Sequence, residues 1–214
     1  MEMWEEETVK WLVKSLFIVL CSFVMVLPGA FAAEPLSGKT VYVDAGHGGE
    51  DSGAVGNGLL EKDVNLDVSK LLNEKLQDEG ADTVMTRTDD TFLTLDDRVA
   101  KADADGSDLF ISIHANSAVP EASGTETYFD STYQAAESER LASEIQERLP
   151  GALETADRGV KESPFYVIKH SKMPSALVEL GFITNESDAD KLISSQYQKK
   201  AADSIAEAVV SYYE

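Results

Sequence analysis

Cysteine is almost absent from this sequence, and its scarcity excludes several classes of protein. The only cysteine among the 214 residues, Cys21, lies in an apolar N-terminal stretch. A folded domain downstream of that stretch therefore has no disulfide framework, no cysteine-rich zinc site and no catalytic thiol. A chain of this length does not need disulfide bonds, because it can bury a core large enough to fold without them.

Basic side chains and long apolar runs are also scarce. The 18 Lys and Arg residues stand against 39 Asp and Glu residues, which gives a formal net charge of −21. Nucleic-acid binders neutralise phosphates with clustered Lys and Arg, and the sequence contains no such cluster, so we expect no nucleic-acid partner. One apolar run stands out, from Leu16 to Leu27, and it is shorter than the roughly 20 residues of a membrane span. A multi-span membrane protein is therefore excluded.

The first 32 residues have the features of a secretory signal peptide. Lys10 and Lys14 precede the apolar run, and the small residues Ala30 and Ala32 follow it. This order predicts cleavage after Ala32 and a protein that is secreted to the extracellular side of a bacterial cell. The alternative is an uncleaved N-terminal anchor, which would be the only contact with a membrane. Residues 33–38 then form a short linker, and residues 39–214 form one domain.

Apolar periodicity after residue 38 predicts strands that alternate with helices. The expected strands cover residues 40–44, 83–87, 109–114, 124–129, 165–169 and 176–182. The expected helices cover 61–80, a segment capped by Thr94, 135–149, a short segment capped by Asn185, and 197–213. This alternation predicts a single α/β domain, with helices on both faces of a sheet.

Two of the three histidines follow or end predicted strands. His47 stands in the Gly-rich segment Gly46-His47-Gly48-Gly49, and His114 ends an apolar strand. Ligand sites of open α/β sheets collect at the carboxyl ends of the strands, so these two imidazoles are expected to meet. Glu61 opens the following helix, where the helix dipole favours an ionised carboxylate. Two imidazoles and a carboxylate suit a zinc ion with an open fourth position. The alternatives are a loop histidine and a helix-capping glutamate.

Glu179 is the most anomalous residue, because it interrupts the apolar run from Ala176 to Phe182. A buried charge without a partner is very costly, so this carboxylate must be paired, bind a cation or be protonated. Burial would also raise its pKa towards the range that suits a general acid or base. We therefore interpret Glu179 as catalytic. The alternative is a structural ion pair with one of three arginines: Arg87, Arg98 or Arg158.

Other catalytic arrangements have little support. No Gly-x-Ser-x-Gly motif is present for a serine hydrolase, and the loop at His47 lacks the Lys and Ser/Thr of a phosphate-binding loop. The third histidine, His170, stands between Lys169 and Ser171 and is expected to be a solvated loop residue.

Five segments in order resemble one known family. They are Asp44 to Gly49, Asp51 to Ala54, Glu61 to Asp63, Ser112 to Asn116 and Val178 to Phe182. Together they are similar to the zinc-dependent N-acetylmuramoyl-L-alanine amidases of bacterial cell-wall turnover, and the similarity covers residues 39–213. The resemblance implies a twisted, mostly parallel sheet of about six strands, flanked by helices.

The resemblance also implies roles for individual residues. His47, Glu61 and His114 would bind one zinc ion, and Glu179 would be the catalytic acid and base. The substrate would be peptidoglycan, cleaved at the amide between N-acetylmuramic acid and L-alanine. Asn116 and Arg158 are candidates for holding the glycan or the peptide, and Asp44 is a candidate for orienting a zinc-bound imidazole.

Two features of the sequence differ from many relatives, and two other hypotheses compete with this interpretation. The segment from Ala115 to Gly124 is a short loop, without the regulatory helix that many relatives insert there, and no wall-binding repeat is recognisable. The competing hypotheses are an inactive wall-binding or regulatory protein on the same fold, and another zinc peptidase or deacylase. We expect the protein to be a monomer.

Overall fold

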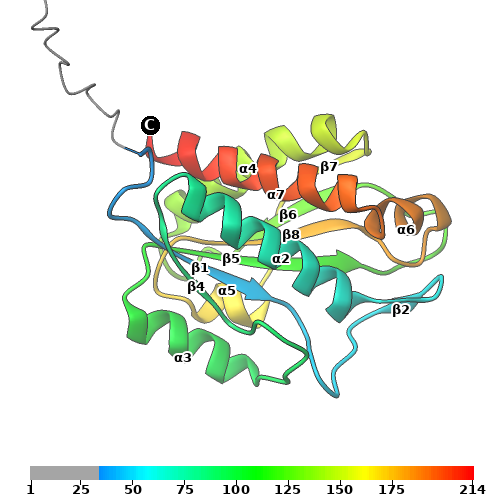
Figure 1. The fold of residues 1–214 in the computed structure, drawn as a ribbon, viewed down its shortest axis with the longest axis horizontal. Coiled ribbons are helices and arrows are strands. Elements are labelled where there is room, and N and C mark those ends of the chain that lie inside the picture. The colour runs from blue at the N-terminus through cyan, green and yellow to red at the C-terminus, as the bar shows by residue number, and fades with distance from the viewer. Residues whose placement is uncertain (1–33) are drawn as a thin grey trace, which may run out of the picture. The chain divides into compact units, whose positions relative to one another are not determined.

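The computed structural model describes residues 34–214, and the predicted signal peptide or anchor lies outside them. A six-stranded sheet forms the centre of the domain, in the order β4-β1-β5-β8-β6-β7 (Figure 1). Its strands are β1 (Thr40–Ala45), β4 (Asp82–Met85), β5 (Leu109–Asn116), β6 (Thr125–Phe129), β7 (Asp157–Glu162) and β8 (Ser175–Phe182). A separate two-stranded hairpin joins β2 (Val55–Gly56) to β3 (Leu59–Leu60).

The strand directions confirm the mostly parallel sheet. Strands β4, β1, β5 and β8 run parallel to one another. Strand β6 is antiparallel to β8, and β7 is parallel to β6, so the last two strands are reversed as a pair. The start of β6 therefore lies beside the carboxyl ends of the four parallel strands, where it contributes to the functional site.

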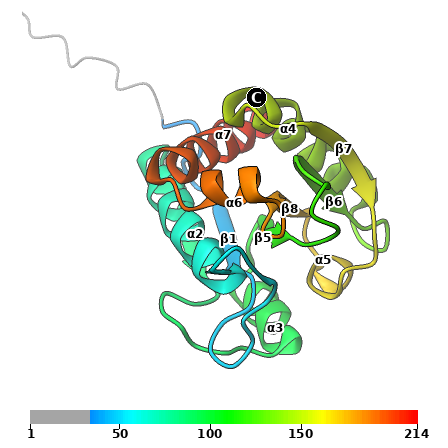
Figure 2. The same ribbon diagram turned by 90° about the vertical axis from the view of Figure 1, so that its right-hand side faces the viewer.

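Helices cover both faces of the sheet (Figure 2). The first face is covered by α2 (Glu61–Asp78), α4 (Ala135–Leu153) and α7 (Ser195–Tyr213), and the second by α3 (Leu95–Asp105) and α5 (Tyr166–His170). A short helix, α6 (Glu186–Leu192), follows β8. Alternation along β1 separates the two cores: Val41 and Val43 pack into the first, and Tyr42 packs into the second. Full burial of each such side chain contributes about 1.5–3 kcal/mol.

Both helix caps that the sequence predicts are present. The Thr94 hydroxyl accepts a hydrogen bond from the backbone N–H of Asp97 at 3.1 Å. The Asn185 side chain likewise accepts one from the N–H of Asp188 at 3.1 Å. Each cap satisfies an amide that the first turn of a helix leaves without a partner.

One sequence-based assignment is wrong, and one strand has no counterpart among the predicted elements. The apolar character of residues 165–169 predicts a strand, but Tyr166–His170 is the short helix α5. Its buried residues Val167 and Ile168 pack against the second face of the sheet, so their apolar character reflects contact with the sheet rather than membership of it. No sequence pattern predicts the strand β7 (Asp157–Glu162), because it is a polar edge strand with little burial. His170 ends α5 as an exposed residue and lies against Tyr166.

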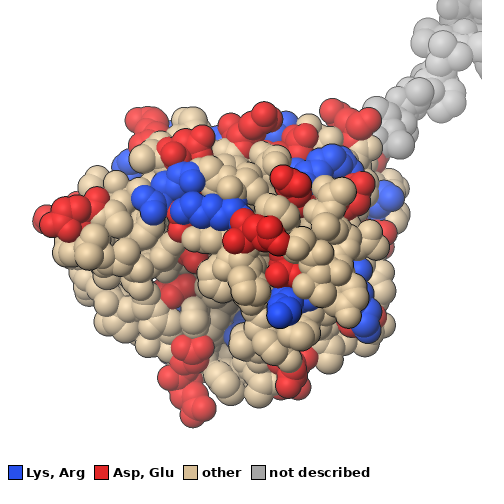
Figure 3. Space-filling model, turned by 180° about the vertical axis from the view of Figure 1, so that it is seen from behind, with Lys and Arg blue, Asp and Glu red and all other residues tan. Residues whose placement is uncertain are grey.

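Residues 34–38, which the sequence assigns to a linker, pack onto the domain. Leu36 is fully buried in the first core, and its N–H donates to the carbonyl of Glu79 at 2.9 Å. Within residues 34–214, no helix is long and apolar enough to cross a bilayer. Acidic side chains are spread over the face seen in Figure 3, with basic ones between them rather than gathered in one patch.

Candidate active site

Three adjacent strands each contribute one chemically important side chain to a row near the carboxyl ends of the parallel strands, the side of the sheet that faces the viewer in Figure 2. His114 of β5 is the register partner of Glu179 in β8, and Glu126 of β6 is the partner of Glu179 on the other side. His47 lies in the loop that follows β1 and has a positive φ of 61°. A non-glycine residue with such a backbone conformation is uncommon and often marks a functional loop.

His47, Glu61 and His114 converge on one point. Each offers a ligand atom, and these atoms all lie within 4.8 Å of one another. Glu61 Oε1 is 3.2 Å from His47 Nε2 and 2.8 Å from His114 Nδ1. The two imidazole rings meet edge to face, with their centroids 5.0 Å apart. The three residues that the sequence singled out as a metal-ligating set are therefore neighbours in space.

Glycine is required where the backbone approaches this group. Gly53 has a φ of +62°, and a Cβ at this position would lie 2.5 Å from Glu61 Oε2 and 2.6 Å from a carbon of the His47 ring. A Cβ on Gly46 would lie 2.4 Å from the ring of His114. The absence of side chains at these two positions lets the loops close around the imidazoles.

Glu61 is held as a carboxylate by its surroundings. Its Oε2 accepts from the N–H of Ala54 at 2.7 Å, and its Oε1 accepts from the N–H of Ala115 at 3.2 Å. Burial opposes ionisation, but the hydrogen bonds from His114 and His47 outweigh it and hold the pKa of Glu61 well below its ordinary value. Glu61 is therefore negatively charged at neutral pH, as a cation ligand must be.

Glu179 lies beside this group, but its surroundings favour the protonated carboxyl rather than the carboxylate. Its side chain is buried, and among residues 34–214 its Oε2 has no hydrogen-bond partner. Burial raises the pKa of Glu179 well above 4.5, and the negative charges of Glu61 and Glu126 raise it further. A carboxyl group with high proton affinity and a free oxygen is suited to receive and deliver a proton.

The three arginines considered as partners of Glu179 have other partners. Arg98 forms a buried ion pair with Asp44 at 2.7 Å, and Arg158 binds Glu126 at 2.7 Å. Arg87 donates to the backbone carbonyl oxygens of Ala45 and Gly46, both at 3.0 Å. The interpretation of Glu179 as half of a structural ion pair is therefore wrong for this structure.

Asn116 and Arg158, the candidates for substrate contact, both bind Glu126, a residue that no sequence motif singled out. Asn116 donates to Glu126 Oε1 at 2.6 Å, and Arg158 donates to Oε2 at 2.7 Å. Lys161 and Tyr128 also donate to this carboxylate. Burial opposes ionisation of Glu126, but these donors outweigh it and lower the pKa of the carboxyl. The one signal in the sequence is Glu126 itself, an acidic residue in a segment predicted to be a strand.

The carboxylate that accepts a hydrogen bond from His47 belongs to Asp51 rather than to Asp44. His47 Nδ1 is 2.8 Å from Asp51 Oδ2, and because a carboxylate accepts, Nδ1 donates in this contact while Nε2 faces Glu61. Asp44 instead binds Arg98 and the hydroxyl of Ser112, the latter at 2.7 Å. Arg98 in turn donates to the backbone carbonyl of His47 at 2.7 Å, so Asp44 acts on His47 only through this arginine.

Two adjoining pockets open at the histidine pair. We call the first the metal pocket; it has a volume of about 260 Å³, and its lining includes His47, Glu61, His114, Asn116 and Glu179. We call the second the aromatic pocket; it has a volume of about 360 Å³, and its lining includes Phe92, Leu93, Leu95, Phe165 and Tyr166. Both pockets share His47, His114, Phe165 and Leu177, so they lie on either side of the same side chains.

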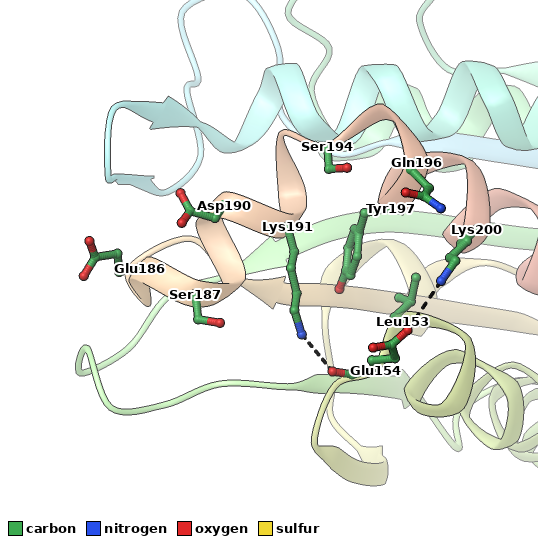
Figure 4. Close-up of a pocket in the computed structure, with 10 residues that line it drawn as sticks. All are labelled: Leu153, Glu154, Glu186, Ser187, Asp190, Lys191, Ser194, Gln196, Tyr197 and Lys200. Atoms are coloured by element: carbon green, nitrogen blue, oxygen red, sulfur yellow. Dashed lines mark hydrogen bonds and ion pairs between the residues drawn. The ribbon is translucent and has the colours of Figure 1, made fainter.

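A larger pocket elsewhere has none of this chemistry. It lies between the ends of α4, α6 and α7 and has a volume of about 640 Å³ (Figure 4). Its lining contains no histidine, and its two lysines are engaged by Glu154: Lys191 donates to the backbone carbonyl at 2.7 Å, and Lys200 lies 3.7 Å from the carboxylate. We therefore place the chemistry at the metal pocket.

The fold and the site together define a hydrolase-type α/β domain with a His/Glu/His group that could hold a metal ion beside a buried carboxyl group. Residues 41–211 match the N-acetylmuramoyl-L-alanine amidase family, and the chain belongs to this family. The family and the fold that the sequence predicted are thus confirmed. By its family, the chain is an enzyme that hydrolyses the amide between N-acetylmuramic acid and L-alanine in peptidoglycan.

The chain is also similar to individual proteins, one of them uncharacterized and two named as amidases. The chain is 63% identical over 198 residues to the uncharacterized protein YqiI of Bacillus subtilis (strain 168), covering 92% of this chain and 96% of that one. It is 57% identical to the N-acetylmuramoyl-L-alanine amidase LytC of the same organism, covering 84% of this chain but only 36% of LytC. A crystal structure of an N-acetylmuramoyl-L-alanine amidase from Clostridium difficile 630 superposes with a TM-score of 0.78 at 36% identity, covering 81% of this chain and 96% of that one.

Proposed function

We propose that the protein is a secreted, zinc-dependent N-acetylmuramoyl-L-alanine amidase that works as an autolysin in cell-wall turnover. In this proposal His47, Glu61 and His114 bind one zinc ion, and Glu179 is the catalytic acid and base. The observation that carries the proposal is the buried oxygen of Glu179, which has no hydrogen-bond partner among residues 34–214 and lies in the same pocket as the His/Glu/His group.

The donor set supports zinc as the metal. Two imidazole nitrogens and one carboxylate oxygen, close enough to share one ion, are the ligands of many catalytic zinc sites. The Asp51 hydrogen bond supports this further, since zinc-ligating histidines usually donate their second N–H to a carboxylate or carbonyl. A zinc ion held here would supply Lewis acidity, which polarises the scissile carbonyl and favours deprotonation of water.

Glu179 then performs the two proton transfers of the reaction. As general base it takes a proton from the attacking water, whose oxygen forms a bond to the lactyl carbonyl carbon. As general acid it gives that proton to the nitrogen of L-alanine when the carbon–nitrogen bond breaks. The products are a free lactyl carboxylate and a peptide with a new amino terminus. The high proton affinity of Glu179 suits it to take up the proton in the first step.

Neighbouring residues support these steps. Asn116 lines the metal pocket beside Glu179 and is held by Glu126, so its amide is positioned to contact the peptide. Arg158 reaches the same carboxylate from β7, with its side chain 35% exposed, and we include it in the substrate-binding surface. The protein acts as a monomer on peptidoglycan outside the cell, which it reaches through its leader.

The competing hypotheses differ in observable ways. An inactive wall-binding protein would be expected to lack a ligand or the general base, whereas all four residues are present and in proximity. Another zinc peptidase or deacylase would share the metal site but release different products.

Product analysis tests the proposal. Purified peptidoglycan is digested with the protein, with and without a chelator, and new amino termini and reducing sugar ends are measured. We expect new N-terminal alanine without new reducing ends, and no release after chelation. Cleavage within the stem peptide, or activity that survives complete chelation, would contradict the proposal.

A further inference from the structure

The aromatic pocket presents an apolar surface to solvent beside the site. Four large apolar or aromatic side chains of this pocket are 38–51% exposed, although residues of these types are usually buried: Phe92, Leu95, Phe165 and Tyr166. Phe92 precedes α3, Leu95 opens it, and Phe165 and Tyr166 lie at the start of α5. Tyr166 hydrogen-bonds Asp96 of α3, which joins the two walls. Exposed apolar residues that gather around a cavity next to a reactive centre indicate a binding site.

We propose that the aromatic pocket binds a sugar ring of the glycan strand, so that the amidase recognises the saccharide as well as the amide. This inference rests on the proposed function, because it assigns one side of the substrate to one side of the site. The ring's apolar face would lie against the aromatic side chains, and carboxylates at the rim would accept hydrogen bonds from its hydroxyl groups.

Charge separates the two sides of the site. Among the described residues that line the aromatic pocket, the only Lys or Arg is Arg98, whose side chain is 3% exposed and paired with Asp44. The exposed carboxylates of Asp89, Asp96 and Asp97 flank Phe92 and Leu95 in the chain. This side is therefore unfavourable for an anionic stem peptide and compatible with a neutral sugar.

The side of Glu179 has the opposite character. Arg158 and Lys161 share the single carboxylate of Glu126, and each side chain is 35% exposed. Both cations are partly exposed, so they are available to complement the carboxylates of a stem peptide. Glu126 is also the strand-register partner of Glu179, so these cations belong to the general acid's side of the site.

The position of Glu179 gives an independent reason for the same orientation. Glu179 lines the metal pocket and is not among the residues that line the aromatic pocket. The general acid must reach the leaving nitrogen, which belongs to the peptide. The acyl side of the amide, which carries the lactyl group and the sugar, then extends past the histidine pair into the aromatic pocket. Its volume of about 360 Å³ is at the small end of the ~300–1,000 Å³ range of ligand pockets, which suits a short saccharide segment.

Binding of a neutral saccharide tests the assignment directly. The probes are tri-N-acetylchitotriose, which carries no peptide, and the acidic dipeptide L-Ala-D-Glu, which carries no sugar. Ligand-detected NMR is recorded with the wild type, with Phe92→Ser and Tyr166→Ser, and with Tyr133→Ser as a matched control, since Tyr133 is 45% exposed outside both pockets. We expect the saccharide to bind the wild type and the control, and to bind each pocket variant about tenfold more weakly, as expected when one aromatic contact is lost.

Kinetics give a second readout on two substrates with the same stem peptide, one carrying the disaccharide and one carrying only D-lactate. We expect the ratio of kcat/KM for the first substrate to that for the second to fall about tenfold in both pocket variants, and to stay unchanged in Tyr133→Ser. An unchanged ratio in both pocket variants, or saccharide binding that they do not weaken, would overturn the assignment. If the wild type released alanine from neither substrate, the proposed function would fail, and the saccharide titration would still decide whether the pocket binds sugar.

Discussion

Glu179 and Glu126 are register partners on the antiparallel strands β8 and β6, yet the pKa of Glu179 is raised and that of Glu126 is lowered. Glu126 accepts hydrogen bonds from four side chains, two of them cationic. Glu179 has an oxygen without a partner among the described residues. Neighbouring carboxyl groups whose surroundings separate their pKa values commonly have different functions. Glu126 is suited to positioning its neighbours, and Glu179 is suited to transferring protons.

Replacing Glu126 tests this division. In Glu126→Gln, Arg158 and Lys161 lose their shared anion, but both are 35% exposed and regain some hydration. We expect the free energy of unfolding to fall by about 1–2 kcal/mol, measured by urea denaturation. The matched control is Glu162→Gln on β7, whose carboxylate is exposed and should change stability by less than about 0.5 kcal/mol. Equal effects of the two substitutions would contradict the structural role of Glu126.

The raised pKa of Glu179 predicts a pH-dependent stability difference in the metal-free protein. Above pH 4.5 the unfolded chain releases this proton while the folded chain retains it, so the free energy of unfolding falls as pH rises towards the folded pKa. Glu179→Gln removes this contribution. We therefore expect the variant's stability relative to wild type to increase between pH 4.5 and pH 8, as measured by urea denaturation at several pH values. A difference that stays constant over this range would show that the pKa of Glu179 is ordinary.

Metal binding should stabilise the folded protein. Zinc at 100 times its Kd adds about 2.7 kcal/mol if it binds only the folded state, and thermal melts with and without added zinc measure this as a rise in Tm. His47→Ala and His114→Ala each remove a ligand, so the rise should be lost. Asp51→Asn leaves the ligands in place but weakens the hydrogen bond to His47, and we expect a roughly 10- to 100-fold loss of zinc affinity. A zinc-induced rise in Tm that survives both His substitutions would place the metal elsewhere.

Gly53 offers a test of the packing around the ligands. Gly53→Ala places a Cβ 2.5 Å from Glu61 Oε2 at a φ of +62°. Gly106→Ala has a similar φ of +66°, and its Cβ would have no atom of residues 34–214 within 4 Å. Both variants should lose roughly 1–2 kcal/mol of stability to the left-handed backbone conformation. We expect reduced zinc affinity in Gly53→Ala alone, as measured by competition with a metal indicator. Equal zinc affinity in the two variants would contradict the close fit of this loop against Glu61.

The sequence predicted features that depend on local patterns and could not predict features that depend on distant pairing. His47, His114 and Glu179 stand out because polar residues follow or interrupt apolar strands, and strand ends meet at one side of a parallel sheet. Glu61 stands out because it opens a helix, where a carboxylate is favoured. The cluster of side chains around Glu126 arises only because β6 pairs antiparallel with β8 and β7 pairs parallel with β6. No local pattern specifies that pairing, because β7 is a polar edge strand.

Two errors have simpler physical causes. Asp44 and Asp51 are both close to His47 in the sequence, and spacing alone does not show which carboxylate the imidazole will contact. The backbone bridge between Gly48 and Asp51 turns the loop so that Asp51 makes the contact. The segment beginning at Phe165 is a short apolar run, and such runs do not distinguish a strand from a single helical turn against a sheet.

The most direct test of the central claim is a parallel measurement of zinc content and alanine release in the wild type, Glu179→Gln and His114→Ala. Glu179→Gln should retain one zinc ion per chain and lose about 10²- to 10⁴-fold in the rate of N-terminal alanine release from peptidoglycan. His114→Ala should lose both zinc and activity. If Glu179→Gln released alanine at the wild-type rate with its zinc bound, Glu179 would not be the proton-transfer group, and the proposed mechanism would be wrong.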